Sequence, residues 1–229
     1  MCHVIVSVHI PKCAGTSFRH VLKQIHGVGF WPNYSADFSR EGVPSGTTCI
    51  HGHFMADAYD RFWPERRLIT MVRHPVQRLV SNYHHFLRRH DPSNPASIYL
   101  HGKGLSLRQF AELDLMQDEI TRYTSGRKPA DFAFVGISER YQESLLLLRR
   151  TFKIEGPMSA THDNVNPERA TPNYSLARED YDHIAKQNSA DMAWYSEACR
   201  HFDAANANHV PDRRQLAESI ARFMAHVAI

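Results

Sequence analysis

A lysine, a glycine and two hydroxyl residues stand together in the segment His9-Ile10-Pro11-Lys12-Cys13-Ala14-Gly15-Thr16-Ser17. The segment lies between a β-branched apolar run at 4–8 and apolar residues at helical spacing over 18–25. A strand, a loop and a helix in this order present backbone N–H groups and the positive end of a helix dipole to an anion. In the loops of nucleotide triphosphatases the lysine directly follows the second glycine, whereas Lys12 precedes Gly15, so that signature is absent. We interpret the segment as a phosphate-binding loop; the alternative is an ordinary turn with an exposed lysine.

A second candidate for anion binding is the segment from Arg73 to Tyr83, which reads RHPVQRLVSNY. Arg73 ends a buried apolar strand, and the carboxyl ends of strands form the edge at which open α/β sheets bind ligands. Ser81 falls in the helix that follows, so a guanidinium and a hydroxyl can converge on one phosphate. Alone, an arginine before a proline is more often an ordinary surface residue.

Two histidines spaced by two, His51 and His53, form a third candidate site. In a strand such a pair points to the same face, as in half of a metal site. No further ligands of suitable spacing accompany the pair, so we predict no metal. An imidazole with an ordinary pKa near 6.5 suits a general base. The remaining alternative is one packed and one surface histidine, since the chain has 16 histidines.

The first two motifs, P-K-x-A-G-T-S and V-R-x-P-x-x-R-x-x-S-x-Y, together resemble those of the sulfotransferases that use 3′-phosphoadenosine 5′-phosphosulfate (PAPS). The resemblance is closest to the carbohydrate branch of the heparan sulfate 2-O and 6-O type. It implies that the 5′-phosphosulfate is held by Lys12, Cys13, Ala14, Gly15, Thr16 and Ser17. It further implies that Arg73 and Ser81 hold the 3′-phosphate, and that adenosine 3′,5′-bisphosphate is the product. The general base falls at His53, with His51 as the alternative. Weaker similarity continues at 51–53, at 134–140 and at 191–195.

The resemblance also implies a hydroxyl acceptor on a carbohydrate, a glycolipid or a small molecule. Cys13 stands where the family often has threonine, and His74 where aspartate or asparagine is frequent. A set of polar residues is similar to the residues that border the family's acceptor cleft. An ordinary helix face exposed to solvent explains the set nearly as well. The set comprises Gln117, Asp118, Thr121, Arg122 and Arg127. Trp31 and Tyr34 are candidates for lining a sugar site or for anchoring a loop. The rival functions are a nucleotide kinase and a non-catalytic nucleotide-binding module.

Composition and charge limit the classes of protein to which the chain can belong. The 229 residues carry a formal net charge of +3, which is far from the basic footprint of a nucleic-acid binder. Four cysteines form no close pair, which favours a reducing compartment. The chain has neither a long apolar run nor a signal peptide at its start. We therefore expect one cytoplasmic domain over 1–229 without a transmembrane segment.

Alternating strand and helix patterns must position these motifs. We predict strands at 4–8, 47–51, 67–73 and 131–137, and helices at 16–26, 55–62, 75–89 and 138–150, the last with Ser138 as N-cap. Two short helices are predicted within 105–125 and further helices from 175 onward. We expect 27–48 to be an irregular connection and 91–104 a polar loop. The pattern predicts an α/β, three-layer, P-loop-like fold with a central parallel sheet flanked by helices and a helical C-terminal part.

Overall fold

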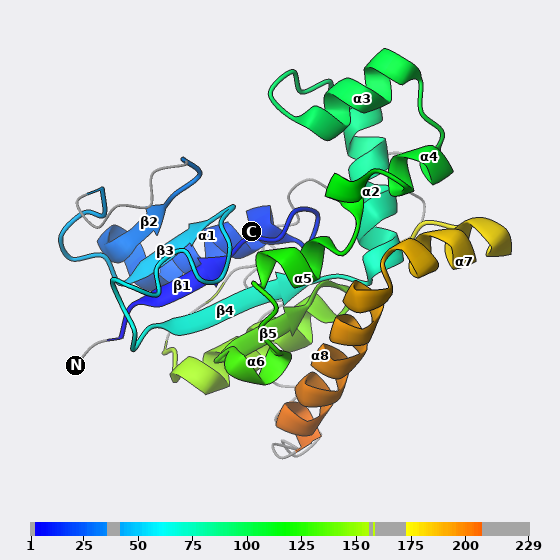
Figure 1. The fold of residues 1–229 in the computed structure, drawn as a ribbon. Coiled ribbons are helices and arrows are strands. Elements are labelled where there is room, and N and C mark those ends of the chain that lie inside the picture. The colour runs from blue at the N-terminus through cyan, green and yellow to red at the C-terminus, as the bar shows by residue number, and fades with distance from the viewer. Residues whose placement is uncertain (1–2, 36–41, 156–157, 159–172, 208–229) are drawn as a thin grey trace, which may run out of the picture.

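A parallel five-stranded sheet forms the centre of the molecule, seen here in a computed structural model (Figure 1). The structure describes residues 3–35, 42–155, 158 and 173–207. The strands lie in the order β2-β3-β1-β4-β5. Their bounds are β1 Ile5–Val8, β2 Phe30–Pro32, β3 Cys49–Gly52, β4 Arg67–Val72 and β5 Phe134–Ile137. All residues of β1, β3 and β5 are buried, as expected for strands that are covered on both faces.

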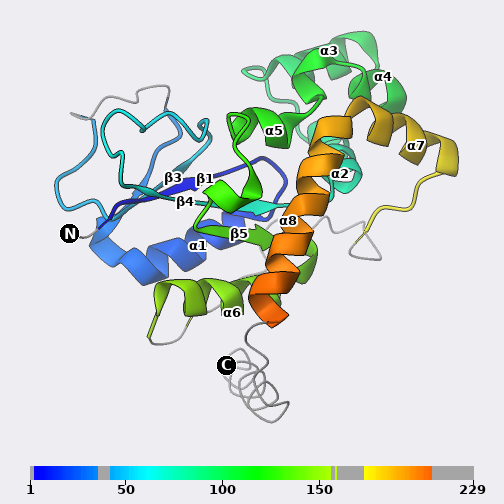
Figure 2. The ribbon, with the colours of Figure 1, turned by 60° about the horizontal axis from the view of Figure 1, so that its bottom comes forward.

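Helices cover both faces of the sheet and make the three layers. Helices α1 (Gly15–His26) and α6 (Tyr141–Phe152) lie on one face, and α5 (Glu119–Tyr123) lies on the other (Figure 2). Helix α8 (Ser189–Ala207) packs against α5 and β5. This arrangement confirms the predicted α/β fold class, and α8 belongs to the predicted helical C-terminal part.

A second group of helices projects from the carboxyl edge of the sheet (Figure 1). It comprises α2 (Pro75–Arg88), α3 (Pro95–Lys103), α4 (Leu107–Ala111) and α7 (Arg178–Gln187). These helices enclose their own apolar cluster, which includes Leu79, Phe110 and Ile184. The short 3₁₀ segments are η1 (Gly27–Gly29), η2 (Asp114–Met116), η3 (Pro129–Asp131) and η4 (Ser138–Arg140).

A buried ion pair joins the projecting helices to α5, which covers one face of the sheet. Arg78 of α2 is fully buried and pairs with Glu119 of α5, and its guanidinium also donates to the carbonyl of Met116 at 3.3 Å. Asp191 of α8 accepts hydrogen bonds from the backbone N–H groups of Ile120 and Thr121 at 2.9 and 2.8 Å. Helices α2, α5 and α8 are therefore joined by polar contacts where their apolar clusters meet.

Several predicted elements were wrong. The predicted loop at 91–104 contains α3, because Asn94 caps the helix by accepting from the N–H of Ala96, Pro95 occupies the first turn and Gly104 ends the helix with a φ of +60°. The predicted helix at 55–62 is a series of turns. The connection 27–48 contains β2.

The predicted N-cap at Ser138 was also wrong. Arg140 occupies the N-cap position of α6 without a side-chain hydrogen bond, because η4 precedes the helix.

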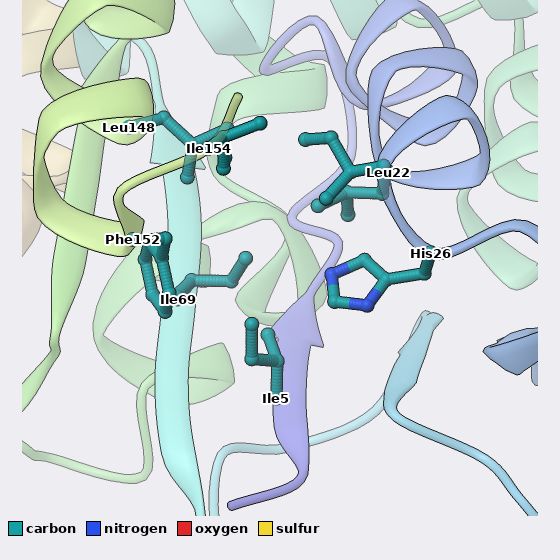
Figure 3. Close-up of a pocket in the computed structure, with 8 residues that line it drawn as sticks. Ile5, Leu22, His26, Ile69, Leu148, Phe152 and Ile154 are labelled. Carbon is teal, nitrogen blue, oxygen red and sulfur yellow. The ribbon is translucent and has the colours of Figure 1, made fainter. Parts of the chain in front are cut away.

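An apolar pocket of about 150 Å³ lies between α1 and α6 beneath β1 and β4 (Figure 3). It is lined by Ile5, Leu22, Ile25, His26, Ile69, Leu148, Phe152 and Ile154. Ile5 begins β1, and the helical residues come from the last turns of α1 and α6, so the pocket lies toward the amino edge of the sheet. The polar motifs all follow the carboxyl ends of the strands, at the opposite edge. None of the helices in the described ranges is long and apolar enough to cross a membrane.

Candidate active site

The loop between β1 and α1 has the backbone shape of an anion-binding turn. Lys12 and Ala14 have φ values of +65° and +60°, in the left-handed region that residues with side chains rarely occupy. Left-handed residues in a turn direct successive N–H groups inward and form a concave site for anions. Ala14 is the N-cap of α1 and supplies no side-chain cap. The N-cap residue of α1 therefore leaves the first N–H groups of the helix without a side-chain cap from its own position.

Cys13 and Gly15 shape this loop by packing. The Cys13 side chain is buried, and burial raises the pKa of its thiol to about 12. The thiol is therefore neutral at physiological pH and fills space within the core. A Cβ atom on Gly15 would lie only 1.7 Å from Nε2 of His9, so a larger residue at this position would displace the imidazole.

Lys12 is a half-buried cation surrounded by further positive charge. Burial, together with the smaller effect of the positive charges of Arg88 and Arg73, lowers the pKa of Lys12 to about 8. Within the described part of the chain no carboxylate forms an ion pair with Lys12. A desolvated and uncompensated cation is stabilised by an anionic ligand, so the residues present fit a phosphate or a phosphosulfate.

Arg73 directly follows β4, and β4 pairs with β1 along its length. Both Arg73 and Ser81 are buried, at 8% exposure each. Nε of Arg73 lies 4.0 Å from Oε1 of Glu139, and the guanidinium lies 5.8 Å from the ring centroid of Tyr174. The same Glu139 oxygen accepts the backbone N–H of His74 at 2.9 Å, so Glu139 ties the start of α2 to η4. The structure therefore places Lys12 and Arg73 at the carboxyl ends of adjacent strands.

His51 and His53 occupy different environments. His51 lies within β3 and is fully buried; its Nδ1 is 2.9 Å from Oγ of Ser7, and burial lowers its pKa to about 3. His53 lies just beyond β3 and is exposed, yet the burial of part of its ring lowers its pKa as well. Of the two histidines, only His53 is exposed and therefore accessible to a ligand.

The hydrogen bond of His53 fixes which of its nitrogens carries the proton. Nδ1 of His53 lies 2.7 Å from the carbonyl oxygen of His9. A carbonyl only accepts, so Nδ1 donates and Nε2 of the neutral ring keeps its lone pair. This is the protonation state that a general base requires.

Aromatic rings surround His53. The centroid of Tyr34 is 5.0 Å from that of His53, and the centroid of Tyr123 is 6.4 Å away. The Tyr34 side chain is 42% exposed. The carbonyl of Tyr123 accepts from the N–H of Ala56 at 2.8 Å, which ties the segment after His53 to α5. Tyr34 was a sequence candidate, whereas His9 and Tyr123 were missed, since no spacing along the chain indicates that they meet His53.

The polar group at 117–127 mainly holds α5 in place. Oδ1 of Asp118 accepts the N–H of Asp191 at 3.0 Å, and Oγ1 of Thr121 donates to Asp191 at 2.9 Å. The side chains of Gln117 and Arg122 donate to backbone carbonyls. Arg127 pairs with Asp60. These side chains have partners within the protein, a structural role that neither the acceptor-cleft interpretation nor the solvated-face interpretation included.

Trp31 lies in β2, partly buried against the core. In the described ranges no group of three or more histidine, cysteine, aspartate or glutamate side chains is arranged to hold a metal ion.

Comparisons with known proteins place the chain in a family. The model of the sulfotransferase family matches residues 2–191. Among solved structures, a sulfotransferase from Alicyclobacillus acidocaldarius is 13% identical, with a TM-score of 0.47 over 84% of this chain and 96% of that one. Mouse sulfotransferase SULT7A1 complexed with PAP is 15% identical, with a TM-score of 0.44 over 84% of this chain and 65% of that one. No curated protein sequence matches. The family model spans most of the chain, and the chain therefore belongs to the sulfotransferase family.

Proposed function

We propose that the protein transfers a sulfuryl group from PAPS to an acceptor hydroxyl. The observation that carries this proposal is the convergence of Lys12, Arg73 and His53 at the carboxyl ends of β1, β4 and β3, which are adjacent in the sheet. One cation for each of the two anionic groups of the donor, the 5′-phosphosulfate and the 3′-phosphate, thus accompanies one neutral base. The family match to residues 2–191 supports the same reaction class.

Lys12 and the loop to Ser17 would hold the 5′-phosphosulfate, with the N–H groups of the left-handed turn directed at its oxygens. Arg73 and Ser81 would hold the 3′-phosphate, which distinguishes this donor from other adenine nucleotides. The pKa of Lys12 near 8 in the free protein rises when an anion binds beside it, so the bound donor keeps the lysine charged.

His53 would take the proton of the acceptor hydroxyl on Nε2 as the oxygen attacks sulfur. The new oxygen–sulfur bond forms while the bond between sulfur and the 5′-phosphate oxygen breaks, and adenosine 3′,5′-bisphosphate leaves with that electron pair. Lys12 and the loop N–H groups meet the negative charge that grows on the leaving phosphate, which is preorganised electrostatic stabilisation.

The acceptor class is proposed from the resemblance and from the rim of the site. A carbohydrate or glycoconjugate is favoured, because the exposed ring of Tyr34 beside His53 offers a flat apolar surface for a sugar ring. A small hydroxylated molecule is the other acceptor of the same chemistry. We also propose a cytoplasmic location for a single domain over 1–229; the location is supported by free Cys13, Cys49 and Cys199.

Transfer of labelled sulfate from PAPS to a panel of sugars, glycolipids and small alcohols tests the proposal. A labelled product that disappears in His53→Ala and Lys12→Ala supports it. Phosphate transfer from ATP instead would make the protein a nucleotide kinase. Binding of adenosine 3′,5′-bisphosphate without turnover on any acceptor would favour the non-catalytic module.

A further inference from the structure

His9 lies within a stack of imidazole rings at the carboxyl edge of the sheet. Its ring centroid is 4.2 Å from that of His53 and 5.0 Å from that of His51, with interplanar angles of 24° and 18°. The backbone of His9 contacts the same segment, because its N–H donates to the carbonyl of Gly52 at 2.8 Å and its carbonyl accepts from His53. One residue therefore holds the His53 ring both by a flat contact and by a hydrogen bond.

Tyr34 fixes the orientation of the His9 ring. The hydroxyl of Tyr34 is 2.9 Å from Nδ1 of His9, and the two rings meet edge to face at 5.8 Å. The guanidinium of Arg19, from α1, lies 5.6 Å from the Tyr34 centroid. Tyr34, which lies in the connection after β2, therefore contacts both Arg19 of α1 and the His9 ring.

The His9 ring also touches the loop assigned to the donor. Nε2 of His9 occupies the space that a Cβ atom on Gly15 would need, at 1.7 Å. Gly15 is the first residue of α1 and follows directly on the left-handed Ala14. A single imidazole is therefore in contact with the candidate base on one side and with the candidate donor loop on another.

We propose that His9 is a positioning residue, which keeps His53 in the tautomer with the proton on Nδ1 and sets the distance between that base and the donor loop. The inference rests on the proposed function for its catalytic consequence. Stacking keeps the plane of the His53 ring in line with the His9 carbonyl, so Nδ1 stays on the carbonyl and Nε2 faces away from it. Tyr34 acts through His9 by preventing rotation of its ring.

Nitrogen-15 NMR of the histidine rings at neutral pH reads the tautomer without any donor or acceptor. In the wild type, His53 should carry its proton on Nδ1. In His9→Ala the stacking partner is absent, so the share of this tautomer should fall. The value of kcat should fall by roughly ten- to hundredfold, as expected when a reacting group is misplaced by about 1 Å, and by more than the KM for PAPS changes.

Tyr34→Phe provides a second variant, because this partly exposed side chain can lose its hydroxyl without opening the core. It should change the tautomer share and kcat in the same direction as His9→Ala, to a smaller extent. Tyr83→Phe is the matched control: the Tyr83 hydroxyl donates to the carbonyl of Leu105 at 3.1 Å, within the separate apolar cluster of the projecting helices. This control should lower stability and leave the His53 tautomer unchanged.

A proton on Nε2 of His53 in the wild type would overturn the inference. An unchanged tautomer share and an unchanged kcat in both Tyr34→Phe and His9→Ala would also overturn it. If His9→Ala does not fold, the same result in Tyr34→Phe alone would overturn it. The NMR signal also separates this inference from the proposed function. If the tautomer responds to these variants while no acceptor takes sulfate, the positioning of His53 stands and the proposed activity fails.

Discussion

At the scale of single residues, the role proposed for Lys12 predicts a defined dependence of the reaction on pH. Its pKa near 8 means that its charge is lost as the pH rises through that value, whereas His53 is neutral above a pKa that lies below 6.5. The kcat/KM for PAPS, which reports the free enzyme, should therefore rise through the His53 pKa and fall above about pH 8. Lys12→Arg keeps its charge, so the fall should move to higher pH. If the fall in kcat/KM above about pH 8 is unchanged in Lys12→Arg, the fall is caused by another group and not by Lys12.

The two histidines of the H-x-H pair should respond differently to substitution. His53→Ala removes the proposed base and should lower kcat by roughly 10²- to 10⁴-fold while adenosine 3′,5′-bisphosphate still binds. His51→Ala instead opens a cavity in the core, because His51 is fully buried, and should lower the melting temperature with a much smaller loss of kcat. Steady-state kinetics and thermal unfolding of both variants check this. The reverse pattern would place the base at His51.

At the scale of elements, the ion pair between Arg78 and Glu119 holds α2 against α5. Both side chains are buried, so Glu119→Gln leaves a buried guanidinium without its counter-charge, which costs about 3–5 kcal/mol. For a chain of this size that corresponds to a melting temperature lower by roughly 6–20 °C. Arg108→Gln is the control, because the exposed pair of Arg108 with Asp180 contributes about 0–1 kcal/mol. Equal shifts of the two variants in calorimetry would contradict this account.

The elements that the sequence predicted correctly are those with a clear apolar pattern. The runs at β1, β4 and β5 are buried on both faces, and α1 and α2 carry regular apolar stripes. The helix α3 was missed because Asn94, Pro95 and Gly104, which read as loop residues, are its caps.

The sequence could indicate which candidate residues lie at the carboxyl edge of the sheet, because Arg73 and His53 directly follow β4 and β3, and Lys12 lies in the loop after β1. Contacts made through space were not predictable. Neither the stacking of His9 on His53 nor the ring of Tyr123 beside it follows from any spacing along the chain.

At the scale of the whole molecule, the two apolar clusters should unfold together. One cluster surrounds the sheet and the other lies among α2, α3, α4 and α7, and the pair of Arg78 with Glu119 joins them. Differential scanning calorimetry should therefore give one transition, with equal calorimetric and van't Hoff enthalpies. Two separate transitions would show that the projecting helices are an independent unit and that the single-domain prediction is wrong.

If the protein binds a PAPS-type nucleotide through both of its phosphate positions, adenosine 3′,5′-bisphosphate should stabilise it against thermal unfolding. This measurement can be made before the acceptor is known. At about 100 times the dissociation constant, a ligand of the native state adds about 2.7 kcal/mol to the free energy of unfolding. The melting temperature should then rise by roughly 5–10 °C. Adenosine 5′-monophosphate at the same concentration should raise it much less, because it lacks the phosphate assigned to Arg73 and Ser81. Arg73→Ala should reduce the difference between the two nucleotides, and His53→Ala should keep it. Equal shifts with both nucleotides in the wild type would contradict the account.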